Sequence, residues 1–171
     1  MTTTNIIEKH PYEPYVPSNA SVLILGSFPG HEQTRHPNKD EWFYSAKRNK
    51  FWEILENVYS ESLQTVSDKK KLFEEVGIGI TDVILSAKRK EKSNLDSNLE
   101  IVEHNKEAIQ KILNNGKINK VFFTSQFVQK QFLKMFPNYS NCECLPSPSP
   151  RYARISLEEK IKIYKQKLPK K

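Results

Sequence analysis

Cysteine is scarce in this chain. Two cysteines occur among 171 residues, Cys142 and Cys144. They lie too close together for a useful structural disulfide, and they are too few for a four-thiolate metal or iron–sulfur site. We therefore interpret both as ordinary strand residues. His31 and His36 show no recognisable metal-ligand spacing, so the sequence predicts no metal site.

Long apolar runs are also missing. No stretch of about 18 apolar residues occurs, so the sequence predicts no membrane-spanning helix and no membrane partner. The first 20 residues lack the basic-then-apolar pattern of a secretory signal. We therefore expect a cytoplasmic protein.

The charges of the chain are not balanced. Lysine and arginine number 27 against 20 acidic residues, which gives a net charge of +7. A basic surplus favours a polyanionic partner such as DNA, because each neutralised phosphate releases counterions. Lysines that only keep the surface soluble would produce the same surplus, and composition leaves both interpretations open.

Short apolar runs and helical patterns alternate along the chain. This alternation is typical of a parallel sheet covered by helices on both faces, and the length suits one domain with a sizeable core. We predict an α/β fold: a single-domain, three-layer α/β/α structure with a central four-stranded, mainly parallel sheet. Residues 1–20 are expected to form an irregular lead-in to a domain of residues 21–171. The expected strands are 21–26, 79–85, 119–125 and 142–145, and the expected helices are 49–59, 67–77, 99–116, 127–136 and 156–168.

A Gly-Ser-Phe-Pro-Gly turn follows the first expected strand. Glycine lets the backbone approach a ligand closely, and proline stiffens the turn. The aromatic ring of Phe28 could offer a stacking face for a flat ring. A tight turn with Phe28 plugging the core is the alternative, and it is favoured when the turn is considered alone. The turn comprises Gly26, Ser27, Phe28, Pro29 and Gly30.

A Pro-Ser-Pro-Ser-Pro-Arg loop follows the last expected strand. Its prolines restrict the backbone before any ligand binds. Serine hydroxyls and backbone amides can hold phosphates, and an arginine can add charge or a wedge beside a base. A proline-rich connector is the alternative. The expected DNA contacts in this region are Ser147, Pro148, Ser149, Arg151 and Arg154.

Other polar and aromatic residues fall near the same edge of the expected sheet, where ligands of such folds bind. Residues 40–52 interleave aromatic and basic side chains, which suits base stacking with phosphate contact, or else a core of aromatics with surface lysines. Asp82 lies inside an apolar strand, as a buried structural acceptor or as a tuned base. The basic run 87–92 is expected to be a solvated loop that could flank DNA. Among the histidines, His31 and His36 could line a pocket, and His10 and His104 are expected to be exposed.

Taken together, these segments resemble the uracil-DNA glycosylase superfamily. VLILGSFPG is similar to its first motif and LPSPSPRYA to its second. FYSAKRNKFWEIL is similar to the segment after motif one in the hypoxanthine-DNA and mismatch-specific glycosylase branches. The similarity covers roughly residues 20–168. It implies an enzyme that flips a nucleotide out of DNA and hydrolyses its N-glycosidic bond, with no cofactor.

The resemblance also implies roles for single residues. Many family members position the attacking water with an Asp or Asn of motif one, and this chain has none there. The functional Asn of the hypoxanthine branch matches Asn49, which we expect to orient the water. The base-reading Asn of uracil-specific members is replaced by Thr124 and Ser125, and the His of their second motif is matched by Leu145.

We therefore predict a monomeric, monofunctional DNA glycosylase for a deaminated or modified base. Hypoxanthine and uracil are the bases that we expect before any other. A glycosylase for a hypermodified base of phage DNA and a non-catalytic DNA-binding module are the alternatives. The loop from Gly30 to Tyr44 is longer than in the hypoxanthine branch, which allows a different pocket. The expected catalytic residues are Asn49 and Asp82; the expected substrate-binding residues are Gly26, Ser27, Phe28, Pro29, Gly30, Tyr44, Thr124 and Ser125; Arg48 and Lys50 join the DNA contacts of the Ser/Pro loop.

Overall fold

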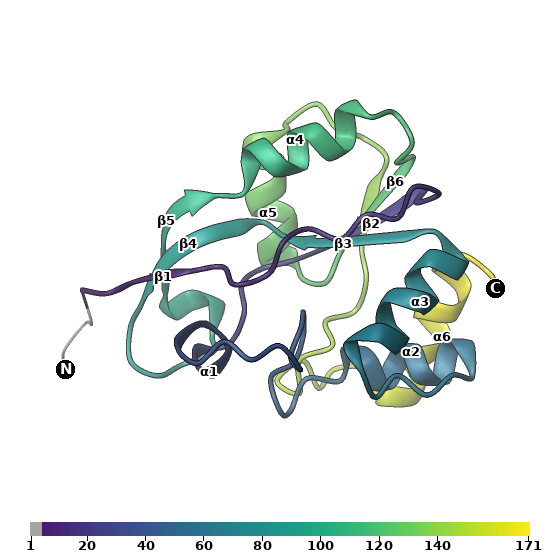
Figure 1. Ribbon diagram of the computed structural model, residues 1–171, viewed down its shortest axis with the longest axis horizontal. Coiled ribbons are helices and arrows are strands. Elements are labelled where there is room, and N and C mark those ends of the chain that lie inside the picture. The colour runs from purple at the N-terminus through teal and green to yellow at the C-terminus, as the bar shows by residue number, and fades with distance from the viewer. Residues whose placement is uncertain (1–4) are drawn as a thin grey trace.

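A four-stranded parallel sheet forms the centre of the protein. The computed structural model describes residues 5–171. In strand order β3 (Ile78–Asp82), β2 (Val22–Gly26), β6 (Lys120–Phe123) and β7 (Cys142–Cys144), every neighbouring pair is parallel. The prediction of an α/β fold around a four-stranded parallel sheet is confirmed (Figure 1).

Helices cover both faces of this sheet because β2 is apolar on both of its faces. Val22 and Ile24 belong to the core on one face, with α2 (Phe51–Tyr59), α3 (Val66–Val76) and α6 (Leu157–Lys167). Leu23 and Leu25 belong to the other core, with α4 (Lys106–Asn114) and α5 (Gln126–Met135). Successive strand residues point to opposite faces, so a continuous apolar run produces the middle layer of three.

Side-chain caps define where several helices begin. Thr65 and Asp68 form a capping box at the start of α3, which ends at Gly77 with a left-handed φ of 75°. The helix therefore begins just before the expected range 67–77, and Asp68 takes part in the cap as its third residue. Ser156 accepts a hydrogen bond from the Glu159 amide at the start of α6, as its sequence predicts.

A second, antiparallel sheet flanks the first and corrects two predictions. It has the order β1 (Ile7–Lys9), β4 (Ile84–Arg89), β5 (Leu99–His104). The expected strand 79–85 is divided at Val83, where the chain leaves one sheet and enters the other. The expected helix 99–116 is wrong over Leu99–His104, because Leu99 and Ile101 alternate with exposed Glu100 and Val102 as strand residues do.

The sequence led us to expect an irregular lead-in, and this prediction is wrong for part of the N-terminal segment. Residues Ile7–Lys9 pair with β4, and Tyr15 forms a further antiparallel bridge with Ile80 of β3.

The prediction of a solvated loop over residues 87–92 is wrong for its first half. Ala87–Arg89 lies within β4, and Arg89 is only 2% exposed. Among residues 5–171, no helix is long and apolar enough to cross a bilayer.

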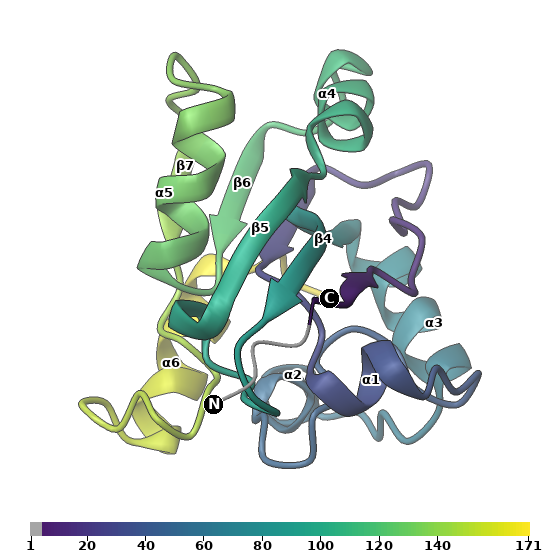
Figure 2. The ribbon, with the colours of Figure 1, turned by 90° about the vertical axis from the view of Figure 1, so that its left-hand side faces the viewer.

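Two short helices complete the fold. The loop after the Gly-Ser-Phe-Pro-Gly turn contains α1 (His31–Arg35), a helix of 5 residues. A 3-10 turn, η1 (Asp96–Asn98), links β4 to β5. The α1 helix, labelled in Figure 2, follows β2 after the turn, and its His31 amide donates to Asn94 Oδ1 at 2.8 Å, close to η1 in the chain. The two short helices therefore lie near the end of β2.

Candidate functional site

Three loops meet at the carboxyl edge of the parallel sheet. The Gly-Ser-Phe-Pro-Gly turn follows β2, Thr124 and Ser125 follow β6, and the Ser/Pro loop follows β7. The backbone amide of Lys50 donates a hydrogen bond to the Pro148 carbonyl at 3.0 Å, which joins the start of α2 to the Ser/Pro loop. The predicted convergence of these loops is therefore observed. In Figure 2 they lie along the lower part of the molecule, around α2 and α6.

A tightly packed polar group occupies the end of β2. A methyl group at Gly26 would collide with Asp82 Oδ1 and with the phenol of Tyr44, so only glycine fits there. The Tyr44 hydroxyl lies 2.9 Å from Thr124 Oγ1, and Thr124 in turn donates to the Leu25 carbonyl at 3.4 Å. Burial raises the pKa of Tyr44 well above its ordinary value, with the charge of Asp82 acting in the same direction. Tyr44 therefore stays neutral and keeps its hydroxyl proton.

The carboxylate of Asp82 is held by a histidine from the N-terminal segment. His10 Nε2 lies 2.7 Å from Asp82 Oδ2, and the His10 side chain is 2% exposed. The Tyr12 amide donates to His10 Nδ1 at 3.1 Å, so the neutral ring carries its proton on Nε2 and donates it to Asp82. The prediction that His10 is exposed is wrong. His104 is half-buried, with Nε2 2.9 Å from Gln131 Oε1, so its expected exposure is also wrong.

The ring of Phe28 is half-buried between two groups that sequence reasoning did not connect with it. The His10 ring meets it edge-on with the centroids 5.9 Å apart. The guanidinium carbon of Arg89 lies 5.8 Å from its centroid. Phe28 also packs against the core between the sheet and α4 and α5. Packing against the core agrees with the core-plug alternative for Phe28, and its role as a stacking face stays a prediction.

Asp96 is a site residue that the sequence analysis did not single out. Ser27 donates a side-chain hydrogen bond to its carboxyl group. Burial raises the pKa of Asp96 and the charge of Asp82 adds to the rise, against the opposing effects of Ser27 and Arg89. The polar stretch around η1 carried no signal for this contact, because Ser27 lies far upstream of Asp96 in the chain.

Asn49, the expected water-orienting residue, stands at the start of α2. Its side-chain Oδ1 accepts a hydrogen bond from the Phe51 backbone amide at 2.9 Å. The backbone amide of Asn49 donates to the Ala46 carbonyl at 2.9 Å. The side chain is half-buried. Because a carboxamide oxygen has two lone pairs, Asn49 can cap the helix and still accept from a water.

The Ser/Pro loop is held in shape by its own serines and by α6. Ser147 Oγ accepts from the Ser149 amide at 3.2 Å, and Ser149 Oγ accepts from the Arg151 amide at 3.3 Å. Each hydroxyl can therefore still donate its hydrogen to a phosphate. The Tyr164 hydroxyl of α6 donates to the Pro146 carbonyl at 2.6 Å.

The basic residues expected to contact DNA differ in their surroundings. Arg48, Arg151 and Arg154 are exposed, while Pro148 between the serines is buried. Lys50 is exposed and pairs with Glu53 at 2.8 Å, one turn further along α2. For residues 40–52, the alternative of a core of aromatics agrees with Trp42 and Phe43, which are buried in the core. Tyr44 is half-buried.

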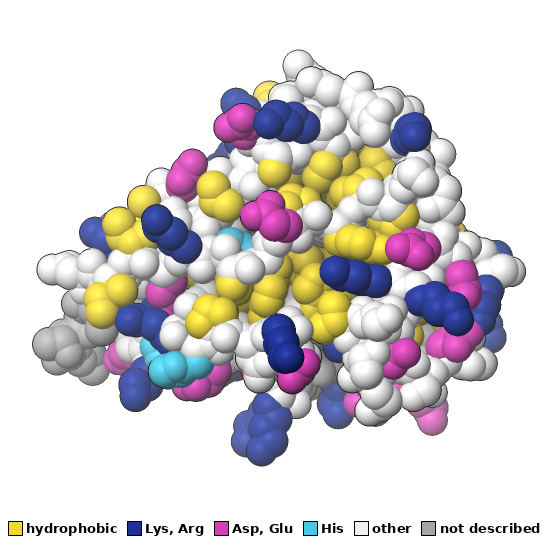
Figure 3. Space-filling model, in the orientation of Figure 1, with side chains coloured by type: hydrophobic (Ala, Val, Ile, Leu, Met, Phe, Trp, Pro, Cys, Tyr) yellow, Lys and Arg dark blue, Asp and Glu magenta, His cyan; other side chains and the backbone are white. Residues whose placement is uncertain are grey.

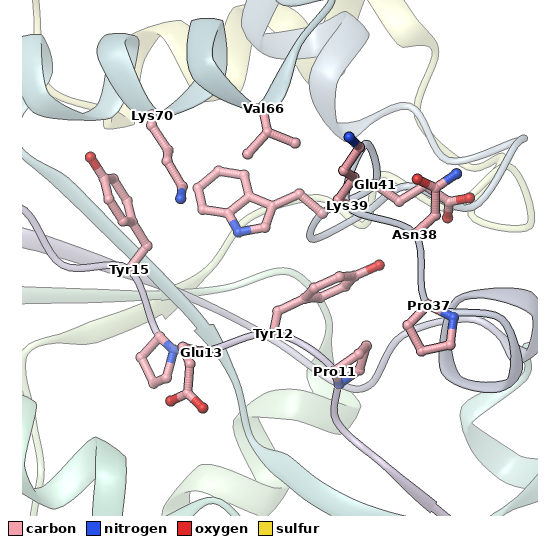
Figure 4. A pocket seen from close by; sticks show the side chains of 12 residues that line it. Pro11, Tyr12, Glu13, Tyr15, Pro37, Asn38, Lys39, Glu41, Val66 and Lys70 are labelled. Carbon is pink, nitrogen blue, oxygen red and sulfur yellow. The ribbon is translucent and has the colours of Figure 1, made fainter.

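A hollow of about 430 Å³ lies outside this group of residues. The N-terminal segment, the loop before Trp42 and α3 enclose it, with Tyr12, Tyr15 and Lys70 around its mouth (Figure 4). Its place on the molecule is the face shown in Figure 3, where apolar side chains are visible between lysines and acidic residues. Neither His31 nor His36 lines it, so this hollow is not the pocket proposed for them. Within residues 5–171, no three His, Cys, Asp or Glu side chains gather as metal ligands would.

Comparison with known proteins gives a family, a curated relative and a solved structure to which the chain is similar. The sequence pattern of the family described as "Uracil DNA glycosylase superfamily" matches residues 13–168. A curated relative named hypoxanthine DNA glycosylase, from Methanosarcina barkeri (strain Fusaro / DSM 804), is 30% identical over 121 residues, which are 65% of this chain and 73% of the relative. A solution NMR structure from Methanosarcina acetivorans, titled with a provisional assignment as a uracil DNA glycosylase, aligns with a TM-score of 0.68 and 22% identity over 94% of this chain and 98% of its own.

Proposed function

This chain belongs to the uracil DNA glycosylase superfamily, and we propose that it is a monofunctional DNA glycosylase that acts as a monomer on a deaminated base in DNA, hypoxanthine before uracil. The observation that carries the proposal is the convergence of motif one, the Asn49 segment and the Ser/Pro loop at one edge of the sheet. The relative named for hypoxanthine supports the order of the two bases.

In the proposed reaction, the target nucleotide leaves the duplex. Its base enters the site beside Gly26, near Tyr44 and Asp82. Flipping costs a few kcal/mol, which phosphate contacts and an inserted side chain must offset. Ser147 and Ser149 would hold the flanking phosphates, and Arg151 would enter the gap left in the stack. The exposed face of Phe28 would stack on the flipped base.

Cleavage of the N-glycosidic bond builds positive charge on the sugar as the base departs with the bonding electron pair. Nearby phosphates and a carboxylate stabilise that charge, so Asp82 is the second catalytic candidate. The half-buried carboxamide of Asn49 would align a water against the anomeric carbon. The water adds to that carbon, its proton passes to solvent or to the departing base, and an abasic site remains.

The test is a panel of end-labelled duplexes and single strands. Each carries one hypoxanthine, uracil, xanthine, mismatched thymine or bulky 5-modified cytosine, and alkali converts abasic sites into breaks. The variant Asn49→Ser removes the carboxamide and keeps an oxygen for the Phe51 amide. We expect excision of hypoxanthine, lost in Asn49→Ser at nearly unchanged Tm. Asn57→Ser, further along α2, is the matched control.

A non-catalytic DNA-binding module is the second candidate. Two observations favour it: motif one has no carboxylate or amide, and Asn49 Oδ1 already accepts from the Phe51 amide. If neither the wild type nor the variants cleave any strand of the panel, while all bind DNA with a steep salt dependence, this candidate replaces the enzyme. Cleavage only at the bulky cytosine would instead favour the hypermodified base.

A further inference from the structure

The N-terminal strand β1 and the residue after it bury polar side chains that an edge strand would normally leave in water. Ile7 and Lys9 are exposed, while the Glu8 side chain is 1% exposed and the His10 side chain, just after the strand, is 2% exposed. Alternate residues of a strand point to opposite faces, so Glu8 and His10 project together into the protein. Burying such groups is costly unless each is paired, and both are.

Glu8 is the centre of a buried cluster of charges. Its Oε2 accepts from Arg89 Nε at 2.9 Å, and its Oε1 lies 3.1 Å from Arg35 Nε and 3.2 Å from His31 Nδ1. Two of these partners, His31 and Arg35, belong to α1, which directly follows the turn of motif one. One carboxylate therefore ties β1 to both β4 and α1.

Arg89 transmits this anchoring to the turn itself. Its terminal nitrogens donate to the Pro29 carbonyl at 2.8 Å and to the Ser93 carbonyl at 2.6 Å. Its guanidinium carbon lies 5.8 Å from the Phe28 ring centroid. Because the guanidinium is a rigid planar fork, fixing one nitrogen on Glu8 fixes the direction of the other two.

His10 is a second residue that contacts the turn, through the ring of Phe28. It donates to Asp82 Oδ2 at 2.7 Å, and its ring meets the Phe28 ring edge-on. The aromatic ring expected to stack on the target base is thus bracketed by two residues, Arg89 and His10. Arg89 is oriented by Glu8, which lies 81 residues away in the chain. His10 belongs to the N-terminal segment and bonds to Asp82, which lies 72 residues away.

We propose that Glu8 and His10 are positioning residues of the base pocket, which hold Phe28 and the turn of motif one in the orientation that receives a flipped base. The inference rests on the proposed function. A cluster of this kind stabilises less than apolar packing of the same volume would. What it supplies is direction, since Arg89 donates a hydrogen bond of defined geometry to Pro29 of the turn and His10 donates one to Asp82.

The test is a double-mutant cycle between Glu8 and Phe28. Glu8→Gln keeps the shape of the side chain and removes the charge that orients Arg89. We expect it to lower kcat/KM for excision about tenfold, and to cost almost nothing further in a Phe28→Ala background, because the two changes act through the same ring. Affinity for an undamaged duplex should not change. Additive losses would show that Glu8 acts elsewhere, and the positioning role would be abandoned.

A second readout is independent of activity. Protein labelled with 4-fluorophenylalanine gives a fluorine resonance for Phe28, assigned by its loss in Phe28→Leu. We expect Glu8→Gln and His10→Ala to shift this resonance, and Lys9→Gln, on the exposed face of the same strand, to leave it in place. Glu8→Asp, which keeps the charge on a shorter side chain, should give a smaller shift and serves if Glu8→Gln does not fold.

The outcomes separate the two proposals. An unshifted Phe28 resonance in Glu8→Gln overturns the positioning role, whatever the enzyme does. A wild type that excises no base of the panel overturns the proposed function, and a shifted resonance would then still establish how the turn is held. Excision by the wild type with a tenfold loss and a shifted resonance in Glu8→Gln supports both.

Discussion

At the scale of single residues, the candidate site is distinguished by carboxyl groups that are buried or half-buried and individually partnered. Asp82 accepts from His10, Asp96 accepts from Ser27, and Glu8 accepts from Arg89. Their surroundings affect ionisation in opposite directions. The pKa of Asp96 is raised, chiefly by burial, whereas that of Glu8 is lowered. Protein stability should therefore respond to pH differently at the two positions.

Glu8 gives the clearer pH prediction. Burial opposes its ionisation, but the hydrogen bond and charge of Arg89, with hydrogen bonds from Arg35 and His31, together hold its pKa below the ordinary 4.5. A carboxyl group with a lower pKa in the folded state adds stability above its unfolded pKa, and that stability is lost as pH falls through the folded pKa. Below about pH 4.5, the wild type should thus lose free energy of unfolding faster than Glu8→Gln, which lacks this titration.

Urea unfolding from neutral pH downward measures the difference between the two curves. The wild-type advantage over Glu8→Gln should shrink on acidification. Glu107→Gln is the control, because Glu107 lies exposed on α4, where its pairing with Lys111 is open to solvent. Parallel curves for the wild type and Glu8→Gln would contradict the buried ionised state of Glu8.

At the scale of elements, two helices hold in place the loops that we propose to contact DNA. α2 begins at the Asn49 segment, and its neighbour α6 reaches the Ser/Pro loop through Tyr164. The amide of Lys50 then joins the two loops directly. A loop that contacts phosphates is useful only if its orientation is maintained, and here that orientation depends on hydrogen bonds from both helices.

Tyr164→Phe tests this dependence. The variant removes the hydroxyl that donates to Pro146 and leaves the buried ring, so we expect a loss of about 1 kcal/mol in stability and weaker binding of duplex DNA. Tyr59→Phe is a matched control, because the Tyr59 hydroxyl donates to the Pro169 carbonyl, in a different segment. Stability and DNA affinity are measured for both. Equal DNA affinity in the two variants would show that the Tyr164 hydrogen bond does not orient the loop.

At the scale of the whole molecule, the basic surplus supplies the attraction for DNA. The chain carries a net charge of +7, and Arg48, Arg151 and Arg154 are exposed beside the candidate site. Attraction of this kind weakens as salt rises, because the counterions released from the neutralised phosphates gain less entropy when the surrounding salt is already concentrated. The arginines at the site should therefore contribute to the salt dependence, and lysines on the far helices should not.

We expect Arg151→Gln and Arg154→Gln each to reduce the slope of log affinity against log salt by about 1. Lys134→Gln, at the exposed end of α5, should leave that slope unchanged. Fluorescence anisotropy with a labelled duplex over a series of salt concentrations measures it. A slope that falls equally in all three variants would indicate that charge acts over the whole surface and that the Ser/Pro loop is no specific contact.

Much of the parallel sheet could be predicted because its signals are local. SVLILG is apolar at successive positions, so it forms a strand buried on both faces. Gly26 at its end, and Pro146 after CECL, mark where the chain turns. The same locality misled the prediction over Leu99–His104, where a strand runs directly into α4. Its alternation is short, and the helical pattern that follows it dominates any longer window.

The sequence by itself determined the helix and strand alternation, the charge and the residues that follow each strand of the parallel sheet. Only the tertiary structure decided that Glu8, His10 and Arg89 belong to the site. The reason is physical: a residue's burial depends on what packs over it, and these partners are separated by 72 and 81 residues along the chain. Nothing in the segments IEKH and AKRK shows that Glu8 of the first pairs with Arg89 of the second. This ion pair exists only once the small antiparallel sheet has formed.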